Sequence, residues 1–173
     1  MIGGKLYVFT GCTQSSSGAT TRVGRLHRYD RSTNTWTALA SAPEGHYQPA
    51  MGVIGGKLYV AGGIEAGGTV SRRLDVYNPS TNTWATKASM PTARRAAAGA
   101  VVGGRLHVVG GWSGGSYLAT VEAYDPVTNF WVPRAASLTA RAGFGVGVVN
   151  GLGYAVGGRN STSVLAANQR YTP

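Results

Sequence analysis

Residues 55–60, GGKLYV, repeat residues 3–8 letter for letter, and the stretch returns as GGRLHV at residues 103–108. A looser copy, NGLGYA, stands at residues 150–155, so the successive offsets are 52, 48 and 47 residues. A nearly fixed period of this length marks an array of similar structural units. The repeat therefore decides the architecture before any single residue is considered.

Further landmarks recur with the same period. A glycine pair follows each of the last three copies, at residues 62–63, 110–111 and 157–158. Tyrosines recur at spacings of 48, 47 and 47 residues, and a tryptophan follows each of the first three tyrosines after seven residues. These aromatic residues are Tyr29, Tyr77, Tyr124, Tyr171, Trp36, Trp84 and Trp131. We interpret them as structural filler between sheets and not as a binding site.

Each unit predicts four short strands and no helix. The first strand is small and apolar, as in residues 96–102 and 143–149, and the second is the Leu-Tyr-Val stretch. The third strand ends at the tyrosine, the fourth begins near the tryptophan, and the segment between them has the Asn, Asp and Pro of turns. Short strands at this spacing indicate an all-β fold. A twisted four-stranded sheet must stack on neighbours to bury its faces, which a propeller achieves.

The double glycine, the tyrosine and the tryptophan seven residues later, repeated at about 50 residues, resemble Kelch repeats over essentially the whole chain. The resemblance implies a β-propeller whose four-stranded antiparallel blades run from an inner strand at the axis to an outer strand at the rim. We expect one Kelch-repeat array over residues 1–173, with units at approximately 1–45, 46–93, 94–140 and 141–173.

The two terminal units are expected to be incomplete. Kelch propellers usually have six or seven blades, whereas this sequence predicts four units of three, four, four and three strands. The first unit opens on its second strand, and the last closes at Tyr171, before an outer strand. Both units would leave unpaired strand edges, which natural β proteins avoid. Two explanations stay open: the chain is a piece of a longer propeller, or copies of it associate to close a ring.

The composition favours an acidic partner. The 173 residues include 16 Lys and Arg against 6 Asp and Glu, a formal net charge of +10, and 13 of the cations are arginine. Arginine suits bidentate contact with carboxylate and phosphate groups. The single cysteine, Cys12, excludes an internal disulfide and a cysteine-based zinc site. No signal peptide or apolar run of membrane-spanning length is evident, which favours a cytoplasmic location and no membrane partner.

The first candidate site is a column of residues just before the inner strands: His46, Arg94 and Arg141, spaced by 48 and 47 residues. Residues 90–94 (MPTAR) and 137–141 (SLTAR) resemble the Kelch pattern in which an arginine enters the central channel. In Kelch-like ubiquitin-ligase adaptors, such arginines contact acidic peptide motifs. Two arginines around one axis could clamp a carboxylate. The alternative is that each arginine bonds loop carbonyls and locks one blade to the next.

The loops after the glycine pairs form the second candidate, because loops on one face of a rigid scaffold commonly bind ligands. Arg159 and Asn160 resemble the adaptor loops that present an arginine to a ligand. Trp112 lies outside the repeated tryptophan series, so it is either an interface anchor or packs against the adjacent blade. The ligand-binding residues expected from both candidates are Arg94, Arg141, His46, Arg159, Asn160 and Trp112.

No catalytic, metal-binding or cofactor-binding residues are expected. The histidines occupy different repeat positions and the carboxylates share no inward column, which disfavours a metal site or a Ser-His-Asp arrangement. Some propellers of this family do catalyse reactions. A copper radical oxidase needs a cysteine crosslinked to tyrosine plus histidine ligands, and Cys12 offers only part of that set. A sialic-acid mutarotase is harder to dismiss, since an arginine-lined pocket suits an acidic sugar.

The arginines are spread over several repeat positions and do not form one basic face, so no specific nucleic-acid readout is expected. The sequence thus predicts a non-catalytic Kelch module that binds an acidic peptide or protein through an arginine-lined face. The alternative is a sugar-binding or sugar-isomerising propeller that resembles sialic-acid mutarotase.

Overall fold

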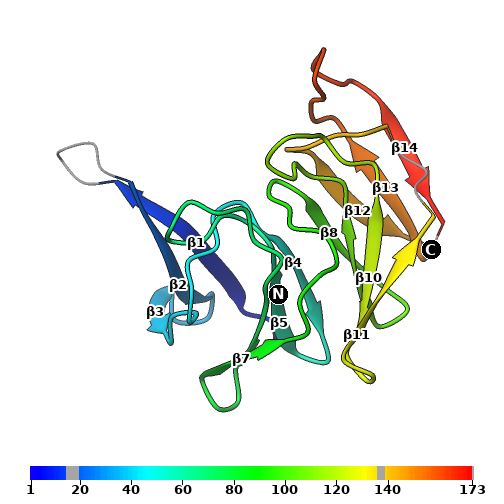
Figure 1. The fold of residues 1–173 in the computed structure, drawn as a ribbon. Coiled ribbons are helices and arrows are strands. Elements are labelled where there is room, and N and C mark those ends of the chain that lie inside the picture. Colours follow the sequence, from blue (N-terminus) through cyan, green and yellow to red (C-terminus); the bar gives the residue numbers. More distant parts are fainter. Residues whose placement is uncertain (15–19, 136–138, 173) are drawn as a thin grey trace.

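The computed structural model describes residues 1–14, 20–135 and 139–172 of the chain. Within these residues the chain forms four antiparallel sheets, or blades, arranged side by side (Figure 1). The first two blades contain β1 (Leu6–Gln14), β2 (Thr20–Asp30) and β3 (Thr35–Leu39), then β4 (Ala50–Ile54), β5 (Lys57–Ala61), β6 (Leu74–Asn78) and β7 (Thr83–Lys87). The last two contain β8 (Ala98–Val102), β9 (Arg105–Val109), β10 (Val121–Asp125) and β11 (Phe130–Arg134), then β12 (Gly145–Val149), β13 (Leu152–Val156) and β14 (Asn168–Tyr171).

The strand order confirms the predicted all-β, four-stranded blades. The described residues give three, four, four and three strands, and within each blade every strand pairs with the next one along the chain. The inner strand β8 packs against both β4 and β12, which places these three strands at the axis of a partial propeller. No helix occurs in the described ranges, and hence none that could cross a membrane. Pro173 and residues 137–138 of the SLTAR segment lie outside the described residues.

The inner strands begin two residues later than the sequence predicts. Ala96 and Gly143 have positive φ angles of 51° and 63°, as does Gln48 at 60°, so the backbone turns before pairing begins. Alanine and glutamine rarely adopt this left-handed conformation, which is why the apolar run alone gave no sign of the bend. Each of these three residues therefore bends the backbone just before one inner strand.

Glycines act at two kinds of position. Gly55 and Gly56 connect β4 to β5 with φ angles of 55° and 72°, the two positive values that a tight type I′ hairpin requires. Gly99 on β8 lies directly against the backbone of Met51 on β4, where an added Cβ would clash with Met51 O. The first kind closes the hairpins and the second lets neighbouring inner strands approach closely.

The repeated aromatic residues both fill and tie the blades together. Tyr124 and Trp131 pack with ring centroids 5.2 Å apart, and both are buried. The Trp131 indole N–H donates to Ala88 O at 2.7 Å, and Asn129 Oδ1 accepts from Tyr124 O–H at 2.7 Å and from Ala88 N–H at 3.1 Å. Ala88 follows the outer strand of the preceding blade. The trio of Tyr124, Asn129 and Trp131 therefore joins two blades. Tyr77, Asn82 and Trp84 repeat the arrangement one blade earlier, around Ala40.

We expect the Asn129→Gly substitution to lower the free energy of unfolding by about 1–2 kcal/mol, because Ala88 N–H and Tyr124 O–H lose their shared acceptor. Asn129 has a φ angle of 54°, which glycine adopts freely. The Asn129→Ala variant adds backbone strain, so it should be less stable than Asn129→Gly by about a further 1 kcal/mol. Urea unfolding of the two variants separates the two effects. Equal stability of all three proteins would show that this trio does not hold the blades.

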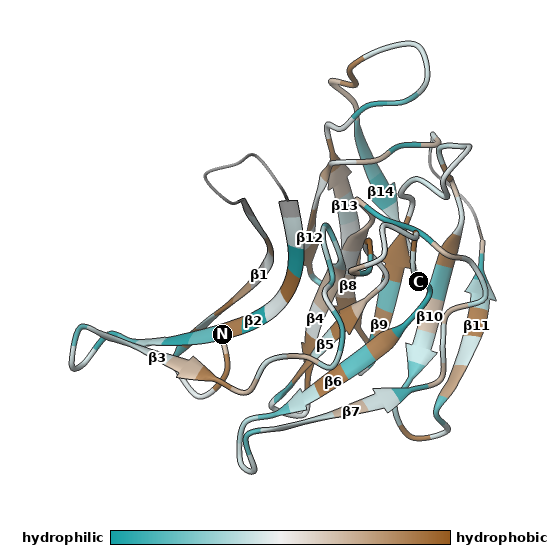
Figure 2. Cartoon of the chain, turned by 60° about the vertical axis from the view of Figure 1, so that its left-hand side comes forward, coloured by the Kyte–Doolittle hydropathy of each residue, from teal (hydrophilic) through white to brown (hydrophobic). Residues whose placement is uncertain are grey.

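Apolar side chains concentrate between the blades. Figure 2 shows hydrophobic residues along the strands of the central blades and more hydrophilic residues in many connecting loops. The largest cluster joins the second and third blades and includes Tyr59, Leu74, Met90, Leu106 and Trp131. The outward faces of the terminal blades keep exposed apolar residues, among them Trp36, Val149 and Val156. The blade-to-blade packing therefore supplies most of the core.

Candidate ligand-binding site

The predicted column before the inner strands is buried. The Arg94 side chain donates from Nη1 to the carbonyl oxygens of Gly110 at 2.9 Å and Thr120 at 3.1 Å. Its Nη2 lies 2.9 Å from Oε1 of Glu122 on β10. Only 1% of the residue is exposed. Burial lowers the pKa of Arg94, while the charge of Glu122 and a hydrogen bond to it oppose that change. These three partners belong to the blade that Arg94 leads into.

The backbone of Arg94 bonds the other side of the junction. Arg94 N–H donates to Ser71 O at 2.9 Å, and Arg94 O accepts from Gly63 N–H at 2.8 Å. Both partners lie in the β5–β6 connection of the preceding blade. One residue therefore joins two blades, with its backbone on one and its side chain on the next.

Arg141 repeats this arrangement at the next junction. Its Nη1 donates to the carbonyl oxygens of Gly157 at 2.9 Å and Ala167 at 3.2 Å, and its Nη2 contacts Oε1 of Gln169. Its backbone N–H donates to Leu118 O of the preceding blade at 3.1 Å. The residue is fully buried. The guanidinium is therefore out of reach of a ligand in solvent.

His46 occupies the same position in the second blade and is also fully buried. Its Nδ1 lies 2.7 Å from Gly62 O, and its Nε2 lies 3.0 Å from Oδ2 of Asp75. For His46, Arg94 and Arg141 the expected ligand contact is thus corrected. Their polar atoms are occupied by contacts within the chain, and they lock the blades instead.

The partners of this column form a column of their own. Asp75, Glu122 and Gln169 lie on the third strand of successive blades at offsets of 47 residues. The expectation that the carboxylates share no inward column is therefore wrong for Asp75 and Glu122. The 47-residue offset between these positions is visible in the sequence. Their role becomes clear only when each acid is paired with the basic residue about 28 positions earlier, which the structure shows.

The ionised carboxylate of Asp75 should make the stability of the folded protein depend on pH. Burial raises the pKa of this carboxyl, but hydrogen bonds from His46, Arg73 and Thr86 outweigh burial and hold the pKa below its ordinary value. A lowered folded pKa gives stability that is present above the unfolded pKa and is lost as pH falls through the folded value. We expect Asp75→Asn to cost about 2 kcal/mol at pH 7, since hydrogen bonds to a charged group become neutral ones.

The gap in unfolding free energy between the original protein and Asp75→Asn should shrink as the pH falls below about 4, the ordinary pKa of an aspartate. Urea unfolding at several pH values measures this gap. A gap that stays constant down to pH 2 would contradict the account of Asp75.

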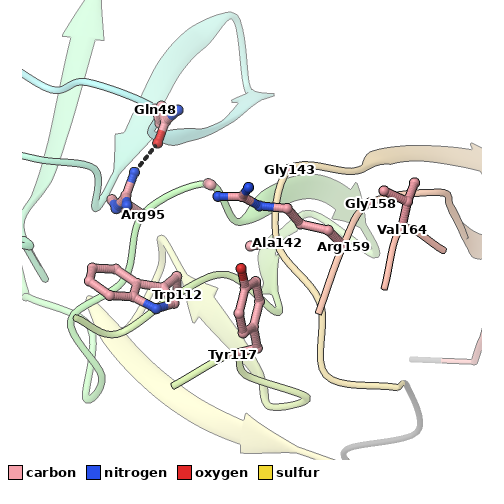
Figure 3. Close-up of a pocket in the computed structure, with 10 residues that line it drawn as sticks. Gln48, Arg95, Trp112, Tyr117, Ala142, Gly143, Gly158, Arg159 and Val164 are labelled. Atoms are coloured by element: carbon pink, nitrogen blue, oxygen red, sulfur yellow. Dashed lines mark hydrogen bonds between the residues drawn. The ribbon is translucent and has the colours of Figure 1, made fainter. Parts of the chain in front are cut away.

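A cavity of about 560 Å³ opens beside the buried column, on the face formed by the loops before the inner strands and after the glycine pairs. Figure 3 shows the side chains around it. Its lining residues come from the second, third and fourth blades and include no carboxylate and no histidine. They are Gln48, Arg95, Ala96, Trp112, Tyr117, Ala142, Gly143, Gly158, Arg159 and Val164. We call this cavity the arginine pocket.

Backbone pairing holds the pocket residues in place. Arg95 and Trp112 exchange two backbone hydrogen bonds of 3.0 and 2.9 Å, and Trp112 in turn forms a bridge with Tyr117. Ala142, Arg159 and Val164 form the same pair of bridges one blade later. Successive side chains of an extended backbone point to opposite sides. Arg95 and Ala142, which follow the buried Arg94 and Arg141, therefore face the pocket.

Two cations and two aromatic side chains give the pocket its chemistry. The Arg95 guanidinium lies 4.6 Å from the centre of the Trp112 ring, and its Nη1 donates to Oε1 of Gln48 at 2.8 Å. Arg159 is exposed, and no hydrogen bond or ion pair to another described residue engages its guanidinium. In Figure 3 this guanidinium reaches across the pocket toward Arg95, and the Tyr117 hydroxyl points into the same space. Both guanidinium groups thus border one cavity and offer charge-assisted donors to an anion there.

Two residues that the sequence predicts to bind a ligand, Trp112 and Arg159, line this cavity. Ligand contact at either residue stays a prediction. The sequence did not predict three other pocket residues: Gln48, Arg95 and Tyr117. Arg95 directly follows Arg94, which the sequence did predict as a ligand-binding residue. Asn160 lies outside the arginine pocket, in a neighbouring cavity. Its Oδ1 accepts from the backbone N–H groups of residues 162 and 163 at 2.9 Å each, which shapes its own loop.

Histidine, cysteine and carboxylate side chains do not cluster in the described residues. No group of three or more His, Cys, Asp or Glu side chains in ranges 1–14, 20–135 and 139–172 is placed to bind a metal ion. Cys12 is exposed on the first blade, far along the chain from the arginine pocket.

Comparisons with known proteins agree with the fold and bear on the site. The chain matches the family described as the KLHDC2/KLHL20/DRC7 Kelch-repeats domain over residues 1–171. The solved structure of YjhT is similar with a TM-score of 0.80 and 25% identity, covering 91% of this chain and 57% of that chain.

Curated relatives named N-acetylneuraminate epimerase are 42% identical over 64 residues. Examples come from Escherichia coli strain K12 and from Shigella flexneri serotype 5b. The match covers 36% of this chain and 17% of each epimerase, so the chain aligns with a minor part of their length.

Proposed function

The chain belongs to the KLHDC2/KLHL20/DRC7 Kelch-repeats domain family, and from this premise we propose that it is a non-catalytic module that binds an acidic peptide or protein partner in the arginine pocket. The observation that carries the proposal is the pairing of Arg95 and Arg159 over one cavity without a neighbouring carboxylate. Two cations that are not neutralised by the protein attract an anion. A volume of about 560 Å³ accommodates a side chain with its flanking backbone.

The two arginines of the pocket support a binding role. Arg159 offers its guanidinium without a competing partner in the described chain, and Arg95 is held in position by Gln48 and the Trp112 ring. A preorganised arginine loses less conformational entropy when it binds. General acid–base catalysis needs a titrating group close to the reacting atom. Tyr117 is the one lining residue, apart from the arginines, that can carry such a proton.

Calorimetric titration with matched peptides tests the proposal. A peptide with a central glutamate should bind at least about 10-fold more tightly than the same peptide with glutamine, because a charge-assisted hydrogen bond contributes about 1.5 kcal/mol or more. The preference should weaken with added salt, since the pocket is open to solvent. Equal affinity for the two peptides at low salt would contradict the proposal.

An acidic sugar is the second candidate ligand. The epimerases that share 42% identity over 64 residues carry N-acetylneuraminate in their name, and this sugar bears a carboxylate. The arginine pocket would then bind the sugar, and isomerisation would be an additional activity. Proton NMR of freshly dissolved N-acetylneuraminate tests for it, since an isomerase speeds the approach to anomeric equilibrium. An unchanged rate with bound sugar would favour binding alone.

A further inference from the structure

A second cavity of about 370 Å³ adjoins the arginine pocket. Tyr117 lines both cavities, so the two cavities meet at this side chain. The residues that line it come from the third and fourth blades: Gly115, Ser116, Tyr117, Thr139, Ala140, Asn160 and Ser161. We call this cavity the hydroxyl groove, because four of the seven lining residues carry a hydroxyl.

The walls of the hydroxyl groove are partly fixed by the blade-locking residues. Thr139 donates its backbone N–H to Oε1 of Gln169 and accepts from Nε2 of Gln169 at its Oγ1, each at 3.1 Å. The same Oε1 contacts the buried Arg141. Asn160 holds the opposite loop through its Oδ1. The groove is therefore a shaped feature of the blade junction.

The chemistry of the groove differs from that of the arginine pocket. None of its lining residues is charged. Within the described part of the chain, the hydroxyl groups of Ser116, Tyr117 and Ser161 form no hydrogen bond. Ser116 and Ser161 thus bring to the groove hydroxyls that can donate and accept, and the Tyr117 hydroxyl stands beside the site for an anion. A charged ligand group would find no counter-charge there, whereas a ligand hydroxyl or amide would find partners.

We propose that the ligand of this protein is bipartite: a carboxylate lies in the arginine pocket, and an uncharged, hydroxyl-bearing extension crosses Tyr117 into the hydroxyl groove. The inference rests on the proposed function and adds the chemistry of the ligand's second half. Two sources share this chemistry. One is a peptide with an acidic residue next to serine or threonine, and the other is an acidic sugar with a hydroxylated side arm.

The test measures the gain in affinity that the extension brings, by calorimetric titration of the full chain. The peptide arm compares acetyl-Glu-amide with acetyl-Glu-Ser-Gly-Ser-amide and acetyl-Glu-Lys-Gly-Lys-amide. The sugar arm compares glucuronate, which has no side arm, with N-acetylneuraminate, which has one. The serine peptide, the extended sugar or both should bind about 5- to 10-fold more tightly than the short probe, as one or two net hydrogen bonds allow. The lysine extension should bring less gain than serine.

A Ser161→Trp variant tests whether the gain in affinity arises in the hydroxyl groove. The indole fills the hydroxyl groove, so the gain from the extension should vanish while the affinity for the short probe stays the same. Ser80→Trp, an equally exposed serine at a distant rim turn, is the matched control and should keep the gain. Thermal melting checks that both variants fold; if Ser161→Trp does not, Ser161→Leu takes its place.

The outcomes separate the two proposals. A gain confined to one arm supports the bipartite ligand and identifies its source. Short probes that bind, with no gain from either extension or a gain that survives the variant, overturn the bipartite ligand and leave the proposed function standing. Failure of the short probes and the extended ones to bind overturns both.

Discussion

Replacement of Arg94 by alanine should lower the free energy of unfolding by about 4 kcal/mol, within the range for breaking a buried ion pair. The substitution leaves Glu122 buried at 4% exposure without its cation. It also removes the donors for Gly110 O and Thr120 O at the junction between the second and third blades. A loss of this size is a large share of the stability of an ordinary domain. Chemical unfolding followed by circular dichroism measures it.

The neighbouring Arg95 is the matched control. It has the same side chain one position later, but it is only half-buried and its partners are Gln48 and the Trp112 ring. Arg95→Ala should therefore cost at most about 1 kcal/mol. A double variant, Arg94→Met with Glu122→Leu, should recover part of the loss, since it removes both charges together. Equal stability of Arg94→Ala and Arg95→Ala would contradict the blade-locking role.

The combined Arg95→Ala and Arg159→Ala substitutions should weaken the binding of an acidic peptide by about 100-fold or more. Two charge-assisted contacts of about 1.5 kcal/mol each correspond to more than two powers of ten in the dissociation constant. Each single variant should lose about 10-fold. The fold should persist, because neither side chain belongs to the buried column.

A charge-matched variant separates specific contact from net charge. Arg72 and Arg170 are both exposed and lie outside the arginine pocket. Their joint replacement by alanine lowers the net charge by the same two units and should change the affinity by less than about threefold at physiological salt. If this control weakened binding as much as the pocket variant, general attraction to the basic protein would explain the affinity.

The sequence predicted the architecture because the repeat constrains every level of the fold. The Gly-Gly hairpins, the tyrosine and the tryptophan seven residues on each occupy one structural position, so copies of one pattern reinforce one another. The bend at Ala96 could not be predicted in this way. The positive φ of Ala96 accompanies backbone hydrogen bonds to Gln48 and Gly143 of the neighbouring blades, and alanine as a residue type gives no indication of it.

The site was harder to predict because adjacent residues of the same type differ in burial. Arg94 and Arg95 are adjacent and chemically identical, yet one is buried and the other lines the pocket. The repeat singled out Arg94 because it recurs as Arg141. A residue that recurs in successive blades is more often required for packing the blades than for binding a ligand. Arg95 has no arginine at the equivalent positions, Tyr47 and Ala142. In a repeat protein, the residue that departs from its column deserves the first functional test.

The central claim, that an acidic ligand occupies the arginine pocket, can be tested at a single side chain. The chain has four tryptophans, and only Trp112 lines the pocket, while Trp36, Trp84 and Trp131 belong to the rim. A nitrogen–proton NMR spectrum therefore shows four indole N–H signals, assigned by replacing each tryptophan with phenylalanine. On titration with a glutamate-containing peptide, the Trp112 signal should shift and the three rim signals should stay. A saturating titration that shifts a rim signal and leaves Trp112 unchanged would contradict the claim.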